Sequence, residues 1–169
     1  LIIMKHDPYS KVYIRETNEE KRVQIGGADK PRVNGEIMER WQSLLNVTAK
    51  IMNVPAGLIM QLNQDNIEVF VSSQTKGNPY KAGSKEELVY GFYCESVIGK
   101  QHKLKVNDAT KSDTWKDNNP DVDLNMVSYM GLPINYPDGK VFGTVCVLDD
   151  KENSYSELYE EFLSKVKQQ

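Results

Sequence analysis

Two pairs of apolar segments, each joined by a short polar turn, constrain the fold of this chain most strongly. The pairs are residues 56–63 with 67–73, and residues 128–134 with 140–148, where the second turn contains Pro137-Asp138-Gly139. Pro-Asp-Gly favours a reverse turn, and apolar or alternating runs separated by so few residues are typical of β-hairpins. Two such hairpins predict a mainly antiparallel sheet, and helices flanking them make the fold class α+β.

A helix is predicted on each side of the hairpins. Asn34 is a suitable N-cap for a helix that ends near Asn53, and the spacing Ser154-x-x-Glu157 is that of a capping box opening a second helix. The apolar residues of the first helix span an arc of about 180°, whereas one core face needs about 100°. This helix is therefore either deeply embedded or packed against both its own sheet and a partner.

The middle of the chain, residues 75–127, is irregular. It is rich in Gly, Asn, Asp, Lys and aromatic residues and lacks a long hydrophobic period. It predicts a strand at 104–106 and short helices near 84–89, 94–99 and 121–126. An irregular stretch of this length inside a compact domain is often functional, so a binding site is expected here.

Residues 1–33 are interpreted as a lead-in segment, and the main domain is placed at 34–169. Alternating apolar residues in 11–14 and 22–25, around a polar run, predict a β-hairpin or a linker from an upstream region. The chain starts at Leu1 instead of an initiator Met. We therefore expect it to be a fragment of a longer protein.

Charge and hydropathy exclude several classes of function. Of the 169 residues, 21 are Lys or Arg and 24 are Asp or Glu, which gives a net charge of -3 with both signs dispersed. This argues against a nucleic-acid-binding surface and against direct membrane contact through a polybasic patch. The longest apolar runs are far shorter than the about 20 residues of a membrane-spanning helix. The two cysteines, Cys94 and Cys146, are far apart in sequence, which indicates reduced thiols and a cytoplasmic location.

Three local sequences, in this order and spacing, resemble the GAF family of sensory domains. They are Gly91-Phe92-Tyr93-Cys94-Glu95-Ser96-Val97-Ile98 with the later Leu104-Lys105-Val106-Asn107-Asp108-Ala109, then Tyr129-Met130-Gly131-Leu132-Pro133-Ile134, and then Asp138-Gly139-Lys140-Val141-Phe142-Gly143-Thr144-Val145-Cys146-Val147-Leu148-Asp149. The resemblance covers about residues 34–167 and rests largely on structural positions, so it is specific for a fold and not for a ligand.

The resemblance implies a GAF/PAS-like six-stranded antiparallel sheet with the terminal helices on one face and a loop-rich ligand pocket on the other. It also implies a small-molecule-binding sensory module of a bacterial signalling protein. Such a module relays its ligand state through terminal helices to a fused output domain, absent from this fragment, such as a histidine kinase or diguanylate cyclase. A ligand-free dimerisation and relay module is the alternative. A homodimer through the terminal helices is expected, with Val47 and Ile51 in its seam.

Ligand-binding residues are expected among the aromatic and polar residues of the middle segment, because ligand pockets are mostly apolar with a few fixed polar groups. Aromatic rings, among them Tyr90, can sandwich a planar ligand, and carboxylates can read its edge. The candidates are Tyr93, Cys94, Glu95, Trp115, Asp117 and Tyr129. The ligand is expected to be a small organic molecule of unknown identity, with no metal and no covalently bound bilin. The alternative for this set is plain core packing beside a solvated loop.

Catalysis is not expected. Within the resemblance, the enzymatic alternative is a free methionine-R-sulfoxide reductase, which uses several clustered cysteines. One of these precedes an Asp near the start of the strand that reads Ser128-Tyr129-Met130-Gly131 here, and no cysteine stands there. Cys146 lacks a partner in sequence. The carboxylates Asp121 and Asp123 are interpreted as solvated.

Overall fold

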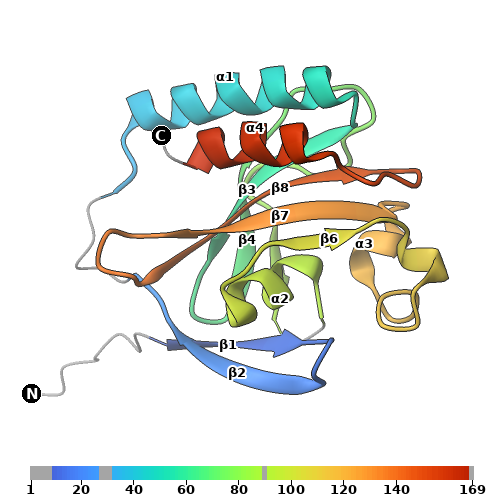
Figure 1. Cartoon of the computed structure of the whole chain (residues 1–169). Coiled ribbons are helices and arrows are strands. Elements are labelled where there is room, and N and C mark those ends of the chain that lie inside the picture. Colours follow the sequence, from blue (N-terminus) through green and yellow to red (C-terminus); the bar gives the residue numbers. More distant parts are fainter. Residues whose placement is uncertain (1–8, 27–31, 89–90, 168–169) are drawn as a thin grey trace, which may run out of the picture.

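A computed structural model describes residues 9–26, 32–88 and 91–167 (Figure 1). Its centre is a six-stranded sheet of strand order β5-β4-β3-β8-β7-β6, in which all neighbours are antiparallel. The strands are β3 (Ala56–Leu62), β4 (Asn66–Ser72), β5 (Lys85–Glu87), β6 (Leu104–Val106), β7 (Ser128–Asn135) and β8 (Val141–Asp149). The two predicted hairpins are β3–β4 and β7–β8, and they join through β3 and β8. The predicted antiparallel α+β fold is confirmed.

Strand β5 stands where the sequence predicted a short helix, near residues 84–89. Its three residues pair with residues 66–68 of β4 at the edge of the sheet, and all three are exposed. The helix prediction was wrong because pairing with β4 satisfies the backbone of this segment, which has no apolar face to bury as a helix. Tertiary context of this kind routinely outweighs the helix propensity of Lys and Glu.

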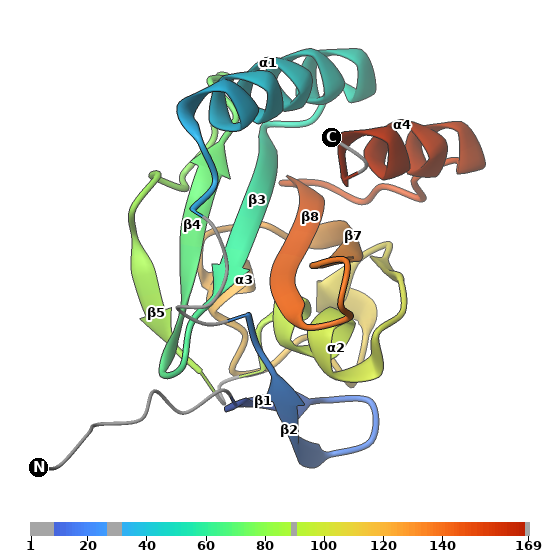
Figure 2. The same cartoon turned by 90° about the vertical axis from the view of Figure 1, so that its left-hand side faces the viewer.

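The helices α1 (Gly35–Met52) and α4 (Glu157–Lys167) cover one face of the sheet together, as predicted (Figure 2). Between them and the sheet lies a core that includes Trp41, Leu45, Val145, Val147 and Leu163. None of the helices in the described ranges is both long and apolar enough to cross a membrane.

Both helix starts follow from capping side chains. The side chain of Asn34 accepts a hydrogen bond of 2.8 Å from the N–H of Ile37, so the predicted N-cap of α1 is confirmed. In α4 the predicted capping residue was wrong. The backbone turns at Tyr155, which has a φ of 44°, and it is Ser156 whose hydroxyl accepts from the N–H of Tyr159 at 3.4 Å.

The opposite face carries α2 (Tyr93–Lys100), a 3-10 turn (Ala109–Lys111), the short helix α3 (Pro120–Asp123), and a separate two-stranded hairpin (Figure 1). The hairpin consists of β1 (Tyr9–Ile14) and β2 (Glu19–Gln24), where the sequence predicted it. Its Val12 and Val23 belong to the core on this face. A Cβ on Gly99 of α2 would lie 2.6 Å from the Ile14 side chain, so the close approach of hairpin and helix requires glycine there.

The hairpin is tied to the domain by hydrogen bonds as well as by packing. The Arg15 guanidinium donates to the carbonyl oxygens of Gly91 at 2.8 Å, Thr114 at 3.2 Å and Asp117 at 2.6 Å. At the other end, the N–H of Gly26 donates to the Val141 carbonyl of β8 at 3.1 Å. The described part of the lead-in segment is therefore a packed element; residues 1–8 and 27–31 of that segment lie outside the described residues.

Candidate functional site

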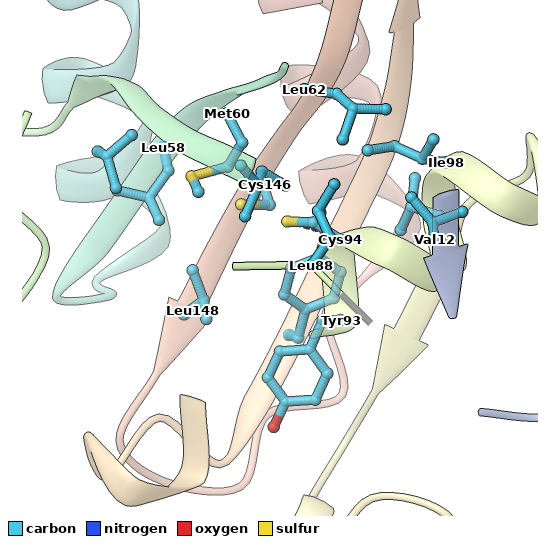
Figure 3. Packing of buried hydrophobic residues seen from close by; sticks show 14 of the residues in the cluster. Val12, Leu58, Met60, Leu62, Leu88, Tyr93, Cys94, Ile98, Cys146 and Leu148 are labelled. Atoms are coloured by element: carbon cyan, nitrogen blue, oxygen red, sulfur yellow. Dashed lines mark hydrogen bonds between the residues drawn. The ribbon is translucent and has the colours of Figure 1, made fainter. Parts of the chain in front are cut away.

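A cavity of about 350 Å³ lies between the sheet and the irregular middle of the chain. Its floor comes from the pocket-facing side chains of β3, β4, β7 and β8, which include Leu58, Met60, Ile67, Val69, Tyr129, Cys146 and Leu148 (Figure 3). Its cover comes from residues 79–86, α2 and α3, with Tyr80, Phe92, Cys94 and Leu124 among them. The cavity lies on the face that the sequence predicted. A largely apolar hollow with a few polar groups is the usual form of a small-molecule site.

The charged side chains of the cavity are mostly acidic. Glu86, Asp121 and Asp123 line it, against one cation, Lys81. Glu86, Asp123 and Lys81 are exposed, so the cavity opens to solvent between residues 79–86 and α3. Its rim is therefore weakly negative, and an anionic ligand would meet repulsion on entry.

Asp121 is buried, whereas the other charged residues that line the cavity are exposed. It is 7% exposed, and it accepts a hydrogen bond of 2.8 Å from the Tyr80 hydroxyl. Burial raises the pKa of its carboxyl group to about 6, against the opposing effects of the Tyr80 hydroxyl and the Tyr93 backbone N–H. The interpretation of Asp121 as solvated was wrong. The sequence signal lay in Asn119-Pro120: the Asn119 side chain caps the N–H of Asp121 at 3.0 Å and Pro120 opens α3, which fixes Asp121 in the first turn.

Two thiols meet at the floor of the cavity. Cys94 of α2 and Cys146 of β8 lie side by side at the cavity floor (Figure 3). The Cys94 sulfur also lies 3.2 Å from the Thr144 hydroxyl, which donates to it, and 3.3 Å from the Tyr129 hydroxyl. Burial, and then the contact with Cys94, raise the pKa of Cys146 and of Tyr129. No sequence pattern indicates this pair, because 51 residues separate the cysteines and the packing of α2 on β8 brings them together.

Tyr93 and Trp115 lie behind the cavity wall and do not line it. Both are buried, at 0% and 4% exposure. The Tyr93 ring stacks on Tyr129, with centroids 4.7 Å apart, and packs against Trp115, with centroids 5.1 Å apart. Of the three predicted aromatic site residues, Tyr129 therefore lines the cavity, and the other two support it. Tyr90 lies outside the described residues.

The two predicted acidic site residues also lie away from the cavity. Glu95 is fully buried, and its carboxylate accepts the backbone N–H groups of Tyr13, Gly91 and Phe92 at 3.1, 2.8 and 2.8 Å. Asp117 is exposed in a polar surface hollow beside Arg15. Both carboxylates lie beside the β1–β2 hairpin, since Glu95 accepts from the Tyr13 N–H and Asp117 lies in the hollow with Arg15, and no local pattern predicts this contact. In the described ranges, no group of three or more His, Cys, Asp or Glu side chains is placed to hold a metal ion.

The family of the chain follows from its sequence and its fold together. The model of the GAF domain family matches residues 36–169. The chain belongs to this family, which is a class of sensory domains. No match in sequence is found among curated proteins.

Solved structures show the same fold at low sequence identity. The GAF domain of an Acinetobacter phosphoenolpyruvate-protein phosphotransferase is 19% identical with a TM-score of 0.61, over 78% of this chain and 77% of that one. A phycoerythrobilin-bound GAF domain of a cyanobacterial phytochrome is 11% identical with a TM-score of 0.64, over 79% and 82%. A type II free methionine-R-sulfoxide reductase of Thermoplasma acidophilum is 14% identical with a TM-score of 0.55, over 78% and 89%. The neighbours thus include a catalyst as well as sensory domains, so the fold alone does not decide between these functions.

Proposed function

We propose that this domain is a sensory module that binds a small, planar organic molecule in the cavity and recognises it through the carboxylate of Asp121. The observation that carries the proposal is a carboxylate buried in an otherwise apolar wall. Burying a charge costs stability unless a partner compensates. The Tyr80 hydroxyl already donates to Asp121, and a ligand that presents N–H donors or a positive charge would add to this compensation, because a carboxylate can accept several hydrogen bonds.

The charges around the cavity also restrict the ligand. Three acids and one lysine line it, so phosphates and carboxylates are disfavoured, and neutral or cationic nitrogen compounds are favoured. The rings of Tyr80, Phe92 and Tyr129 and the aliphatic floor provide contact area for a flat, apolar body.

The Asp121→Asn variant tests this assignment with three ligands of matched shape. Benzamidine is a cation, benzamide is neutral and benzoate is an anion. We expect saturation-transfer NMR to show benzamidine and benzamide in the wild-type cavity and benzoate outside it. In Asp121→Asn, benzamidine binding is lost because the carboxylate is gone. In the wild type it weakens as the pH falls below about 6, where Asp121 takes up a proton.

Stability provides the control for the same variant. The folded-state pKa of Asp121, about 6, lies above the ordinary value of 3.8 for an aspartic acid side chain, so the folded protein holds this proton more tightly than the unfolded chain. The group therefore favours folding at low pH, and this contribution is lost as the pH rises from about 4 to 6. At pH 8, the free energy of unfolding of Asp121→Asn should exceed that of the wild type by about 1–3 kcal/mol. The variant should therefore unfold at a higher temperature. A folded variant that still binds benzamidine, or equal binding of benzoate in the wild type, would contradict the assignment.

We propose that the ligand state leaves the domain through α1 and α4. Each helix exposes an apolar pair spaced i, i+4: Val47 and Ile51 on α1, at 51% and 48% exposure, and Leu158 and Phe162 on α4, at 59% and 37%. Exposed apolar pairs on neighbouring helices favour a helical partner. The proposed assembly is a cytoplasmic homodimer with a four-helix interface, and the proposed recipient is an output domain such as a histidine kinase or diguanylate cyclase. The exposed apolar face of α1 and α4 also fits the second candidate function, a ligand-free relay module. That function is favoured if the cavity binds none of the three probe ligands.

Substitution of the seam residues tests the dimer. We expect the wild type to sediment as a dimer and Val47→Glu/Ile51→Glu as a monomer, because two buried carboxylates per protomer would lack partners. Leu124→Glu is the matched control. Leu124 is also apolar and exposed, at 47%, but it lies on the cavity side of the sheet, so this variant should remain dimeric. A monomeric wild type, or a double variant that stays dimeric, shows that the seam is elsewhere.

We propose that the domain is not a methionine sulfoxide reductase. The strand β7 begins Ser128-Tyr129-Met130-Gly131 and carries no cysteine. The chain has two cysteines in all, so a third thiol that could complete such a cluster is missing.

A further inference from the structure

The contact between Cys94 and Cys146 places two reducing groups inside a cavity that small molecules can enter. Both sulfurs belong to residues that line it. Cys94 is 7% exposed and Cys146 is fully buried, so Cys94 is the thiol that an incoming molecule meets first. The two side chains lie side by side in the folded chain (Figure 3), so a bond between the sulfurs would join groups that the fold already brings together.

Two hydroxyl groups and a second thiol surround the Cys94 sulfur. The Thr144 hydroxyl donates to it at 3.2 Å, the Tyr129 hydroxyl lies at 3.3 Å, and the Cys146 thiol completes the set. Burial raises the pKa of Tyr129 and of Cys146, so neither is an anion beside the Cys94 sulfur. The Thr144 hydroxyl, which donates to the Cys94 sulfur, is thus a fixed polar contact of the sulfur that an oxidant would meet first.

The surroundings of the pair select among oxidants. The rim charges are Glu86, Asp123 and Lys81, with Asp121 in the wall, and this acidic excess disfavours anionic oxidants such as oxidised glutathione. A cavity of about 350 Å³ with a partly covered mouth favours a compact, neutral molecule. We propose that Cys94 and Cys146 form an oxidation site within the cavity, at which a small uncharged hydroperoxide converts the two thiols to a disulfide. This proposal does not depend on the identity of the ligand above.

The proposed reaction takes two electrons from the protein and delivers them to the peroxide. The sulfur of the Cys94 thiol attacks the terminal oxygen of the hydroperoxide, so an S–O bond forms and the O–O bond breaks. The leaving oxygen takes the proton of the Cys94 thiol and departs as water or an alcohol, which leaves a sulfenic acid on Cys94. The Cys146 sulfur then attacks the Cys94 sulfur, the S–O bond breaks, and the oxygen leaves as water with the Cys146 proton. The product is a disulfide that links α2 to β8 across the floor of the cavity.

Mass spectrometry of the wild-type chain after treatment with hydrogen peroxide tests the pair directly. With alkylation of free thiols under denaturing conditions, we expect neither cysteine to be alkylated, a mass loss of about 2 Da, and a linked peptide that contains Cys94 and Cys146. Dithiothreitol should restore both thiols. Oxidised glutathione should leave both thiols free, and free methionine-R-sulfoxide should give no turnover.

Three variants separate this site from general thiol oxidation. Cys146→Ala should stop at the sulfenic acid and yield a dimedone adduct on Cys94. Thr144→Val keeps the shape of the side chain but removes a donor, so oxidation should slow by about tenfold. Tyr155→Phe is the control, since it removes a buried hydroxyl that bonds to Ser128 and not to a cysteine, and the rate should not change. Peroxide treatment that leaves both thiols free, sulfinic acid without the linked peptide, or equal rates in Thr144→Val and the wild type would overturn the proposal.

Discussion

Replacing Gly143 with alanine is expected to lower the free energy of unfolding by about 3 kcal/mol or more, because β3 and β8 cannot keep their present spacing. Gly143 pairs with Gln61 of β3 at the centre of the sheet. A Cβ here would lie 1.8 Å from the backbone oxygen of Met60 and 2.8 Å from its carbonyl carbon. A backbone group cannot rotate aside as a flexible side chain can, so the strands must separate and their hydrogen bonds must lengthen.

Urea unfolding of Gly143→Ala and of a second glycine variant measures this effect. Gly35→Ala is the control, because no atom lies within 4 Å of the Cβ it would add. Gly35 opens α1, and alanine is favoured over glycine in helices, so this variant should be as stable as the wild type or slightly more stable. Equal unfolding midpoints for the two variants would show that the central strands accommodate a methyl group after all.

Replacing Glu95 with alanine should cost about 3–5 kcal/mol of stability and release the β1–β2 hairpin. The carboxylate is fully buried and accepts the N–H groups of Tyr13, Gly91 and Phe92. Without it, these donors stay buried without an acceptor, and each such donor costs about 1–3 kcal/mol. Two of them lie at the start of α2, where Glu95 occupies the third helical position and bonds back to the residue before the helix. The third is the link to β1.

Two measurements resolve these roles of Glu95. Urea unfolding reports the total loss, and limited proteolysis in the exposed turn at residues 15–18 reports release of the hairpin. Glu95→Gln keeps one carbonyl oxygen, so it should retain part of the stability. Glu161→Ala, at an exposed position of α4, is the control and should change the unfolding free energy little. If Glu95→Ala were as stable as this control, the carboxylate would be available for a ligand, as the sequence predicted.

The cavity and the two-helix face are linked through β8. Successive residues of a strand point to opposite faces of the sheet. Cys146 therefore contributes to the cavity floor, while its neighbours Val145 and Val147 pack in the core beneath α1 and α4. A displacement of β8 by a ligand or by a disulfide would act on both faces at once. This gives the proposed relay a physical route, although it needs a difference in affinity between two packings to shift a population.

The sequence predicted much of the fold because its signals are local. The turn at 137–139, the alternation in β3 and β4, and the Asn34 cap each depend on residues close together along the chain, and the structure confirms the elements they predict. Where local patterns and tertiary contacts compete, the prediction failed. The residues of β5 have helix propensity and no apolar face, so only the free edge of β4 makes them a strand.

The candidate site shows the same division. Composition indicated a binding site in the irregular middle segment, the family resemblance implied the face of the sheet on which the cavity lies, and two of the six predicted site residues, Cys94 and Tyr129, line it. The other four carry the same kinds of side chain, but α2 turns Tyr93 and Glu95 toward the aromatic stack and the hairpin, while Trp115 and Asp117 lie in the loop that Arg15 holds. Residue type alone does not distinguish a cavity wall from the layer behind it.

By itself, then, the sequence determined the antiparallel sheet and most of its helices and strands, because these follow from periodicity, turns and caps within short windows, and the family resemblance implied the face that carries the cavity. Only the tertiary structure decided that Asp121 is buried, that Glu95 is occupied by backbone N–H groups, and that Cys94 meets Cys146. Each of these depends on segments that are distant in sequence and are brought together by packing on the sheet. Burial and contact set the protonation and reactivity of a side chain, so the chemistry of this site is a property of the folded molecule.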